Sequence, residues 1–433
     1  MATDGRRARG DSVARTMVIM QPDDLAHRRF DPLAPQVLTD PYPFYAWLRA
    51  HDPVHWGAAG SEHQEGDEGG CWYITRYDDA SALLKDARLG REIDKVLPER
   101  VTLPRDADAA AIIRQWMVLR DPPWHTYLRG LVHRAFTPQM IERWTPRMAN
   151  IVDSLLGQVD RAGFDLIQEV AVPFPIYVVA EMLGVPPADA PLFSPWTKAL
   201  AAVIEFEQTP EVAARAATAM RELADYLRTI IHQRKRQPQD DLISALIGFA
   251  DDEPVSEDVL IGACTQLLFG GNDPVAHLIG NGVLALLQHP AQWNGLGNQR
   301  MASSMVTGSA VDEVMRYDSS VQMTFRYALT DVEWQGKQMR TGDLVAIVLG
   351  AANRDAKHFE SPDTLEITRS PNRHLSLGQG IHYCLGAALA RTEGRVVLGA
   401  LRRTMPSLRV AQDEVQWQRT VAVRGLTGLR LAV

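Results

Sequence analysis

The stretch LGQGIHYCLG places a single cysteine, Cys384, among glycines and two residues after His382. Gly378 and Gly380 permit a tight turn that brings the backbone close to a flat partner. The apolar periodicity that follows predicts that Cys384 begins a helix, where exposed N–H groups and the helix dipole lower the pKa of a thiol. A lone thiolate suits the axial position of a heme iron better than a zinc site. A lone buried cysteine is more often structural, but the glycines and His382 favour metal binding.

A second unusual stretch is FGGNDPVAHL, which lies inside a long apolar run typical of a buried helix. Two small residues, Gly270 and Gly271, are followed by an amide, Asn272, a carboxylate, Asp273, and then Pro274. Proline inside a helix removes one N–H donor and costs about 3 kcal/mol. It also leaves the carbonyl of Gly270, four residues earlier, without its helical donor. A function at this helix must compensate for that cost.

Two further pairs have helical spacing. Glu313 and Arg316 are three residues apart in DEVMRY, and His125 and Arg129 are four apart in DPPWHTYLRGLV. On a helix each pair lies on one face. The simplest interpretation is an exposed ion pair and a solvated helix face, both of which are common.

The elements that must position these residues are mainly helical between about residues 110 and 290. Apolar periodicity predicts helices in IIRQWMVLRD, over 137–156, over 212–235, over 260–287 and, near the C-terminus, from Leu385 to about Arg403. Earlier, Phe44, Trp47 and Leu48 form one helical face. Strands are expected at CWYITRY (71–77), TFRYALTDVEW (324–334) and DLVAIVL (343–349), with loops at 57–70 and 361–383. We therefore expect a flexible tail over 1–28 and a single helix-rich domain over 29–433.

The composition is that of an ordinary globular protein of 433 residues with a formal net charge of −8, which argues against nucleic acid or an anionic membrane as partner. The three cysteines, Cys71, Cys264 and Cys384, show no paired spacing, so we expect a reducing cytoplasm. No window has eighteen consecutive apolar residues and no signal-peptide core is present. A cytoplasmic monomer without a membrane anchor is the expectation.

The chain resembles the cytochrome P-450 family, and in particular its soluble bacterial members. LGQGIHYCLG matches the heme-binding signature Phe-Gly-x-Gly-x-His-x-Cys-x-Gly through Gly378, Cys384 and Gly386, except that Leu377 replaces the phenylalanine. The resemblance extends from DPYPFYAWLR to RGLTGLRLAV. It implies a mainly α fold with small β-sheets (α+β), triangular in outline, with heme b between the long central helix and the helix after the cysteine. It also implies a heme-thiolate monooxygenase that activates O2, because a thiolate donor favours cleavage of the O–O bond.

The resemblance assigns roles to the paired residues. His125, Arg129, Arg326 and His382 would hold the heme propionates, since cations and donors hold carboxylates. His374 is expected only to pack.

In the same way, Glu313 and Arg316 would form a buried pair that braces the cysteine loop. A third member usually comes from an arginine in Pro-Asp-Arg-Phe, but here Thr364 stands at that position in Pro-Asp-Thr-Leu. The bracing arginine is therefore missing or comes from elsewhere, with Arg369 as the candidate.

Relatives carry Ala/Gly-Gly-x-Asp/Glu-Thr-Thr on the long helix, and Pro274 takes the place of the threonine that accompanies the acid Asp273. Two hypotheses follow. A water at the Gly270 carbonyl, or a substrate hydroxyl, could relay protons with Asp273 or Asn272. Alternatively, the reaction depends less on that relay, as in radical C–C or C–N coupling of an aromatic substrate, or in direct use of peroxide.

The implied partners are a ferredoxin and its reductase, with electrons ultimately from NAD(P)H, and a bulky hydrophobic or aromatic natural product. Substrate contacts would come from 89–117, 193–206, the residues before Gly270, 321–325 and 421–423. The candidate pocket walls are Phe193, Trp196, Phe206, Met323, Phe325 and Ala422. A non-catalytic heme-binding protein is the alternative from another class.

Overall fold

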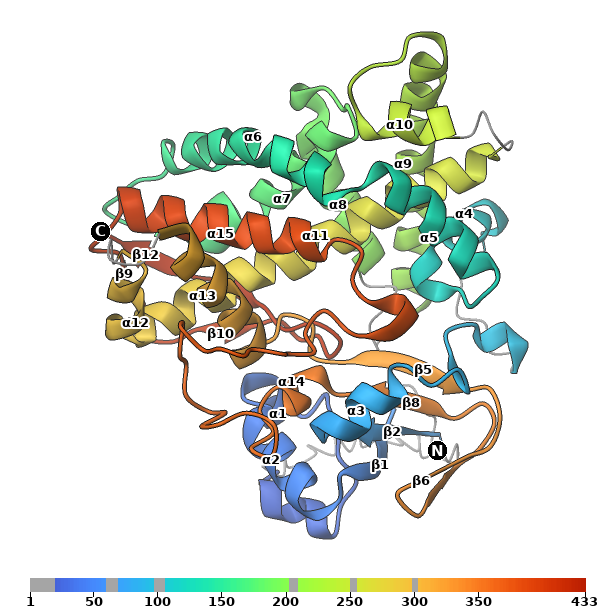
Figure 1. Cartoon of the computed structure of the whole chain (residues 1–433), viewed down its shortest axis with the longest axis vertical. Coiled ribbons are helices and arrows are strands. Elements are labelled where there is room, and N and C mark those ends of the chain that lie inside the picture. Colours follow the sequence, from blue (N-terminus) through green and yellow to red (C-terminus); the bar gives the residue numbers. More distant parts are fainter. Residues whose placement is uncertain (1–19, 60–68, 97–105, 202–208, 250–254, 298–302) are drawn as a thin grey trace, which may run out of the picture.

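The structure, a computed structural model, describes residues 20–59, 69–96, 106–201, 209–249, 255–297 and 303–433 (Figure 1). Its helices are α1 Pro35–Thr39, α2 Tyr42–His51, α3 Tyr77–Leu83, α4 Ala107–Ile113, α5 Trp124–Ala135, α6 Pro138–Leu156, α7 Pro173–Met182, α8 Phe193–Ala201, α9 Pro210–Arg236, α10 Leu242–Gly248, α11 Glu257–Gln288, α12 Pro290–Gly295, α13 Ser303–Tyr317, α14 Leu349–Ala352 and α15 Ala387–Thr404. Shorter helical turns are η1 Pro22–Ala26, η2 Ile93–Lys95, η4 Met117–Leu119, η5 Ile167–Ala171, η6 Pro187–Leu192 and η9 Gly380–His382. Most helices gather on one side of the molecule, and most strands lie on the other side together with α1, α2, α3 and α14 (Figure 1).

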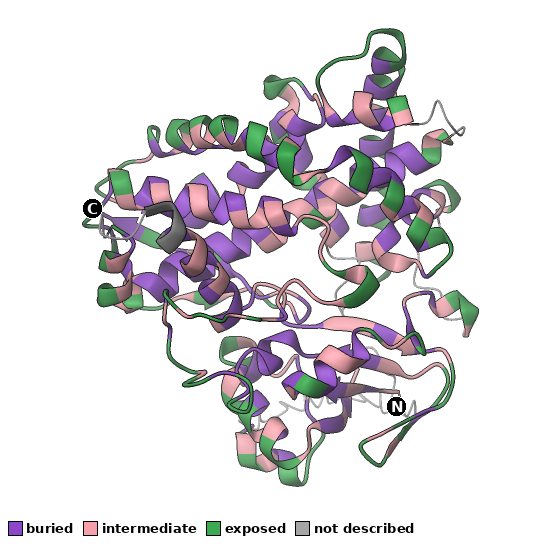
Figure 2. Ribbon diagram, viewed as in Figure 1, coloured by how far each residue is buried: buried purple, intermediate pink, exposed green. Residues whose placement is uncertain are grey.

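The long helix α11 is the central element of the helical side. Ser256 caps it by accepting a hydrogen bond from the N–H of Val259 at 3.3 Å, and it ends at Gln288, just before Pro290. Both ends of α11 lie within three residues of the ends of the helix predicted over 260–287. The helix continues through Pro274, and most of its residues are buried by the helices around it (Figure 2). Tertiary packing therefore supports a helix that carries an interior proline.

The larger sheet lies on the other side of the molecule. Its strands are β1 Val54–Ala58, β2 Gly70–Ile74, β8 Leu344–Ile347, β5 Thr324–Ala328 and β3 Leu89–Gly90, in that spatial order. The smaller sheets use β4 Phe164–Asp165, β6 Val332–Trp334, β7 Lys337–Met339, β9 Arg409–Val410, β10 Gln416–Trp417, β11 Leu426–Gly428 and β12 Arg430–Ala432. β3 pairs with β5 in antiparallel register, with Gly90 opposite Tyr327. This pairing joins segments more than two hundred residues apart.

The N-terminal boundary differs from the expected one. Met20 and Leu25 are buried against the core that contains Phe30 and Tyr45, and η1 already forms at Pro22–Ala26. Packing thus begins before residue 28, because apolar side chains interrupt the polar tail. Residues 1–19 lie outside the described part of the chain.

Other predicted elements show smaller differences. IIRQWMVLRD does not form one helix, because α4 ends at Ile113 and a separate turn, η4, follows. The predicted C-terminal helix is confirmed, but α15 begins at Ala387, so Cys384 lies three residues before it. In the described part of the chain no helix is both long and apolar enough to cross a membrane.

Candidate functional site

A cavity with about 1550 Å³ of empty space lies among α11, α15 and the cysteine loop. α11 contributes Gln266, Leu267, Phe269, Gly270, Gly271, Pro274, Val275 and Leu278 to its wall. Cys384 and Gly386 line the side formed by the cysteine loop.

The cysteine loop holds Cys384 through its backbone. The N–H of Cys384 donates to the carbonyl of Leu377 at 2.8 Å, and Gly378 and Gly380 adopt φ of +69° and +72°, which favour glycine. Burial raises the pKa of the Cys384 thiol, while the N–H of Gly386 and the guanidinium groups of Arg129 and Arg391 oppose that rise. The pKa is thus raised rather than lowered as the sequence predicted, because burial outweighs the backbone donor. A bound metal ion deprotonates such a thiol.

Basic side chains converge at one end of the cavity. The four residues that the resemblance assigned to the propionates, His125, Arg129, Arg326 and His382, all line it. Burial, followed by repulsion from Arg91, Arg326, His125 and Arg129, lowers the pKa of His382 to about 2. Both ring nitrogens of His125 are buried without a hydrogen-bond partner in the described residues. Buried polar groups normally have partners, so this cluster is built for an anionic group.

Arg91 belongs to this cluster although the sequence did not indicate it. It is the residue after β3, and the Gly90–Tyr327 pairing places it opposite Arg326 on β5. Its Nε is buried without a partner in the part of the chain that the structure describes, and burial lowers the pKa of Arg91 to about 10. No local motif marks Arg91, because its position depends on a long-range strand pair. Arg129 also donates to the carbonyl of Tyr383 at 2.8 Å, which ties α5 to the cysteine loop.

The brace around Glu313 is complete. Glu313 is fully buried and receives Nε and Nη2 of Arg316, each at 2.8 Å. Arg369 donates its Nε to both carboxylate oxygens at 3.1–3.2 Å, and Asn372 adds a further donor at 3.1 Å. Arg316 also binds the carbonyl of Thr364 at 3.0 Å. The buried pair is therefore confirmed, and Arg369 supplies the arginine that position 364 lacks.

His374 does not line the cavity. Its Nε2 lies 3.1 Å from Asp312 Oδ1, and Arg391 Nε donates to the same oxygen at 2.7 Å. His374 thus helps to pack the loop, as expected.

The predicted proton-relay residues divide between two faces of α11. Gly270 and Pro274 line the cavity, whereas Asn272 and Asp273 do not. The helical period explains this, since residues four apart share a face and Asn272 points away from it. The side-chain amide of Asn272 is buried and has no partner among the described residues. Burial raises the pKa of Asp273 to about 6, while Lys198 opposes the rise. The structure does not bring these two side chains to the cavity wall.

The residues predicted to form the walls of the substrate pocket also lie away from the cavity. Phe193 and Trp196 pack against Tyr226, with ring centroids at 5.4 and 6.0 Å from it. Met323 and Phe325 pack in the core below the sheet, and the carbonyl of Ala422 accepts the N–H of Met323. None of these side chains lines the cavity, because each lies on the core-facing side of its element. Phe206 lies outside the described residues.

Besides Arg91, two polar cavity residues escaped the sequence analysis. Gln266 lines the cavity with its Oε1 unpartnered, and Glu393 on α15 lines it with both carboxylate oxygens unpartnered among the described residues. Burial raises the pKa of Glu393 well above its ordinary value. Glu393 follows Leu389 by four residues on the apolar face of α15, a signal that could have identified it.

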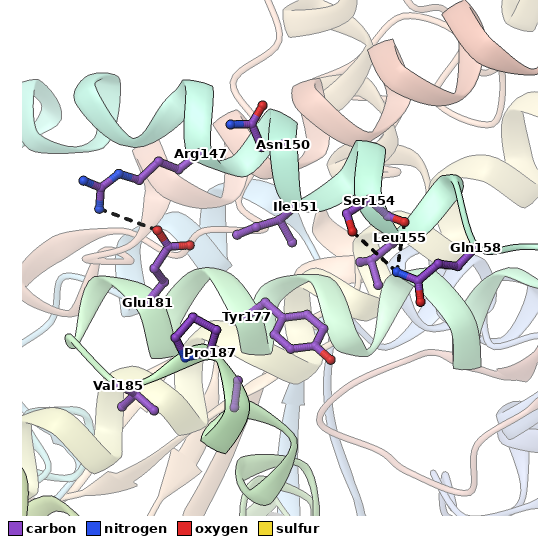
Figure 3. Close-up of a pocket in the computed structure, with 11 residues that line it drawn as sticks. Arg147, Asn150, Ile151, Ser154, Leu155, Gln158, Tyr177, Glu181, Val185 and Pro187 are labelled. Carbon is purple, nitrogen blue, oxygen red and sulfur yellow. Dashed lines mark hydrogen bonds and ion pairs between the residues drawn. The ribbon is translucent and has the colours of Figure 1, made fainter.

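A separate surface pocket lies between α6 and α7 (Figure 3). Arg147 and Glu181 form an ion pair across it at 3.6 Å, whereas Ser154 lies toward its other end. Its side chains include no buried unpartnered polar atom among the described residues. The cavity at Cys384 is therefore the better candidate for a functional site.

Comparison with known proteins agrees with this geometry. The family model described as Cytochrome P450 matches residues 298–404. The polyketide biosynthesis cytochrome P450 PksS of Bacillus subtilis (strain 168) is 36% identical, over 93% of this chain and 98% of that protein. The structure resembles P450BioI in complex with an acyl carrier protein ligated to hexadec-9Z-enoic acid (TM-score 0.82, 34% identity, 92% and 99% of the two chains). It also resembles CxnD, an enzyme for C–S bond formation in chuangxinmycin biosynthesis (TM-score 0.77, 30% identity, 91% and 94%).

The site and fold define a heme-thiolate oxidoreductase. The chain belongs to the cytochrome P450 monooxygenase family. A heme fits the residues present, because Cys384 would ligate its iron, and Arg91 and His125, whose side chains have unpartnered nitrogens among the described residues, would hold its carboxylates.

Proposed function

We propose that this enzyme oxidises a bulky, largely apolar natural product in the cavity beside Cys384, with electrons from a ferredoxin and its reductase. The observation that carries the proposal is a single cavity that joins the cysteine, the basic cluster and an apolar wall. That wall includes Met117, Val118, Leu267, Phe269 and Val321. When heme is bound, its thiolate-ligated iron supplies the activation of O2. The protein residues hold the cofactor, orient the substrate and exclude water.

The surface over the cysteine loop supports an electron-carrying partner. Ile381 and Tyr383 are unusually exposed for large apolar residues, at 51% and 39%. Lys85 packs against Gly380, and Arg391 donates to the hydroxyl of Tyr383. An apolar centre with basic neighbours complements a small acidic protein and would steer its approach. Lys85→Glu should slow reduction by ferredoxin severalfold at low salt, measured by stopped flow, whereas reduction by dithionite stays unchanged.

The cavity face of α11 favours oxidative coupling over hydroxylation. Relatives are expected to carry an alcohol at the position of Pro274, but here the neighbouring cavity residues are Gly270, Gly271 and Val275, and Asp273 points elsewhere. In coupling, the substrate loses two hydrogen atoms as one C–C or C–N bond forms. Both oxygen atoms of O2 leave as water, with two electrons from ferredoxin and two protons from solvent. In hydroxylation one oxygen atom enters the product instead.

Turnover of 2-naphthol under ¹⁸O₂ distinguishes these reactions. Coupling gives a binaphthol without ¹⁸O and consumes one NADPH per product, whereas hydroxylation gives a diol that carries the label. Product formed with peroxide alone, at the rate seen with ferredoxin, would identify a peroxide-using enzyme. Pro274→Thr should shift product toward hydroxylation. If this substitution changes neither the product nor the coupling of NADPH to product, Pro274 does not determine the reaction.

The state of the cysteines supports a cytoplasmic location. Cys71, Cys264 and Cys384 are all unpaired, which suits a reducing compartment.

A further inference from the structure

Two acceptors on the cavity face of α11 lie one helical turn apart. Gln266 lines the cavity, and its Oε1 is buried without a hydrogen-bond donor among the described residues. Gly270, four residues later, is exposed in the middle of a buried helix because it faces the cavity. Its carbonyl has no helical donor from residue 274, since proline carries no N–H. Gln266, Gly270 and Pro274 lie along one line of the helix because they are spaced by four.

Apart from Glu393, which lies on α15, two further polar groups of the cavity wall are already engaged. The hydroxyl of Thr324 accepts hydrogen bonds from Arg91 and Arg326, at 3.0 and 3.2 Å. The hydroxyl of Ser376 donates to the carbonyl of Met315 at 2.5 Å. The basic cluster serves the heme carboxylates. A substrate in the apolar part of the cavity therefore meets acceptors at Gln266 and Gly270.

We propose that Gln266 Oε1 and the Gly270 carbonyl form a subsite of two acceptors, each of which can bind one hydrogen-bond donor of the substrate, namely a phenolic or alcoholic O–H or an amide or indole N–H. The subsite rests on the proposed oxidation of a natural product in this cavity, and it specifies the substrate class. A buried unpartnered acceptor is costly, so a ligand that supplies a donor is favoured over an apolar ligand of the same shape. Gln266 and Gly270 are about 6 Å apart along the helix axis, since each residue rises about 1.5 Å. The space beside Gly270 is open, because a Cβ there would have no neighbour within 4 Å.

The subsite can be tested by ligand binding to the heme-containing enzyme, without turnover. The probes are 1-phenylimidazole and its three hydroxyphenyl isomers, whose imidazole nitrogen binds the iron and shifts the Soret band. At least one hydroxyl isomer should bind the unchanged enzyme five- to tenfold more tightly than 1-phenylimidazole. Gln266→Leu and Gln266→Met should reduce that preference to less than twofold while binding 1-phenylimidazole normally. Gln288→Leu, which removes an exposed glutamine from the end of the same helix, should keep the preference.

Pro274→Ala gives a second readout, because it restores an N–H donor to the Gly270 carbonyl. The preference should fall in this variant without loss of 1-phenylimidazole binding. The subsite is refuted if no hydroxyl isomer is preferred, if the preference survives in both Gln266 variants, or if neither variant binds 1-phenylimidazole normally. Absence of a Soret shift with every probe would instead contradict the proposed use of the cavity for ligands beside the heme.

Discussion

Arg91 and Arg326 donate to the same acceptor, Thr324 Oγ1, at 3.0 and 3.2 Å. The two guanidinium groups come from strands far apart in the sequence and lie in one buried cluster. Repulsion between them contributes to the lowered pKa of Arg326, after the larger effect of burial. Two like charges remain this close only when an anion or a dipole compensates them, and the heme carboxylates fit that role.

Replacing Arg91 should therefore weaken heme retention. In Arg91→Gln, one charge-assisted hydrogen bond is lost, worth about 1.5 kcal/mol or more, so heme should leave about tenfold faster. Transfer of heme to excess apomyoglobin measures the rate. Arg88→Gln is the matched control, because Arg88 is exposed and pairs with Asp86 outside the cavity. Equal rates in the two variants would show that Arg91 does not hold the cofactor.

Loss of Arg369 should destabilise the cysteine loop. Arg369→Gln removes donors from the fully buried carboxylate of Glu313, which should lower the free energy of unfolding by about 1.5–3 kcal/mol. Urea titration followed by circular dichroism measures the change. Arg373→Gln, at an exposed position nearby, should have little effect. In the double variant Arg369→Gln with Thr364→Arg, partial recovery would show that both positions reach Glu313.

Asp273 should make the protein less stable as pH rises. Its folded pKa, raised by burial to about 6, exceeds the ordinary value of 3.8, so the folded state binds the proton more tightly. The contribution of Asp273 to the free energy of unfolding is therefore greatest below about pH 4. It falls by about 3 kcal/mol in total as the pH rises to about 6. Because the buried His277 opposes this decline, stability should rise with pH between about 4.5 and 6 in Asp273→Asn relative to the unchanged protein, as measured by denaturation from pH 4.5 to 7. A variant that follows the unchanged protein at every pH would contradict burial of this carboxyl.

His277 should make the protein less stable as pH falls, which is opposite to the effect of Asp273. Burial lowers its pKa to about 4 from the ordinary value of 6.5, so the unfolded state binds the proton more tightly. This contribution to stability is lost as pH falls from about 6.5 to about 4. Between pH 4 and 6 the two groups nearly cancel. His277→Leu should thus expose the decline due to Asp273, measured in the same denaturation series; a flat profile in this variant would refute the assignment.

Local patterns in the sequence predicted the elements whose signals are local. The limits of α11 and α15 follow, to within three residues, from apolar periodicity, and Cys384 from its glycine turn. Arg91 could not be found this way, because only the pairing of β3 with β5 brings it to Arg326. Asp273 was placed at the cavity by motif position, whereas the helical period turns it aside.

The substrate walls were the least predictable part of the site. Phe193 and Met323 are apolar and lie in segments near the cavity, but apolar character alone does not distinguish a cavity wall from the core. Gln266 was overlooked for the opposite reason. A lone glutamine in an apolar helix carries no signal until the structure shows that its oxygen has no donor.

The brace at Glu313 has a consequence for recognising such proteins from sequence. A search that requires arginine at position 364 would reject this chain, although Arg316 and Arg369 both reach the same carboxylate. If the brace is defined by where its positive charges lie in space, this protein has it. If the brace is defined by residue spacing along the sequence, this protein lacks it.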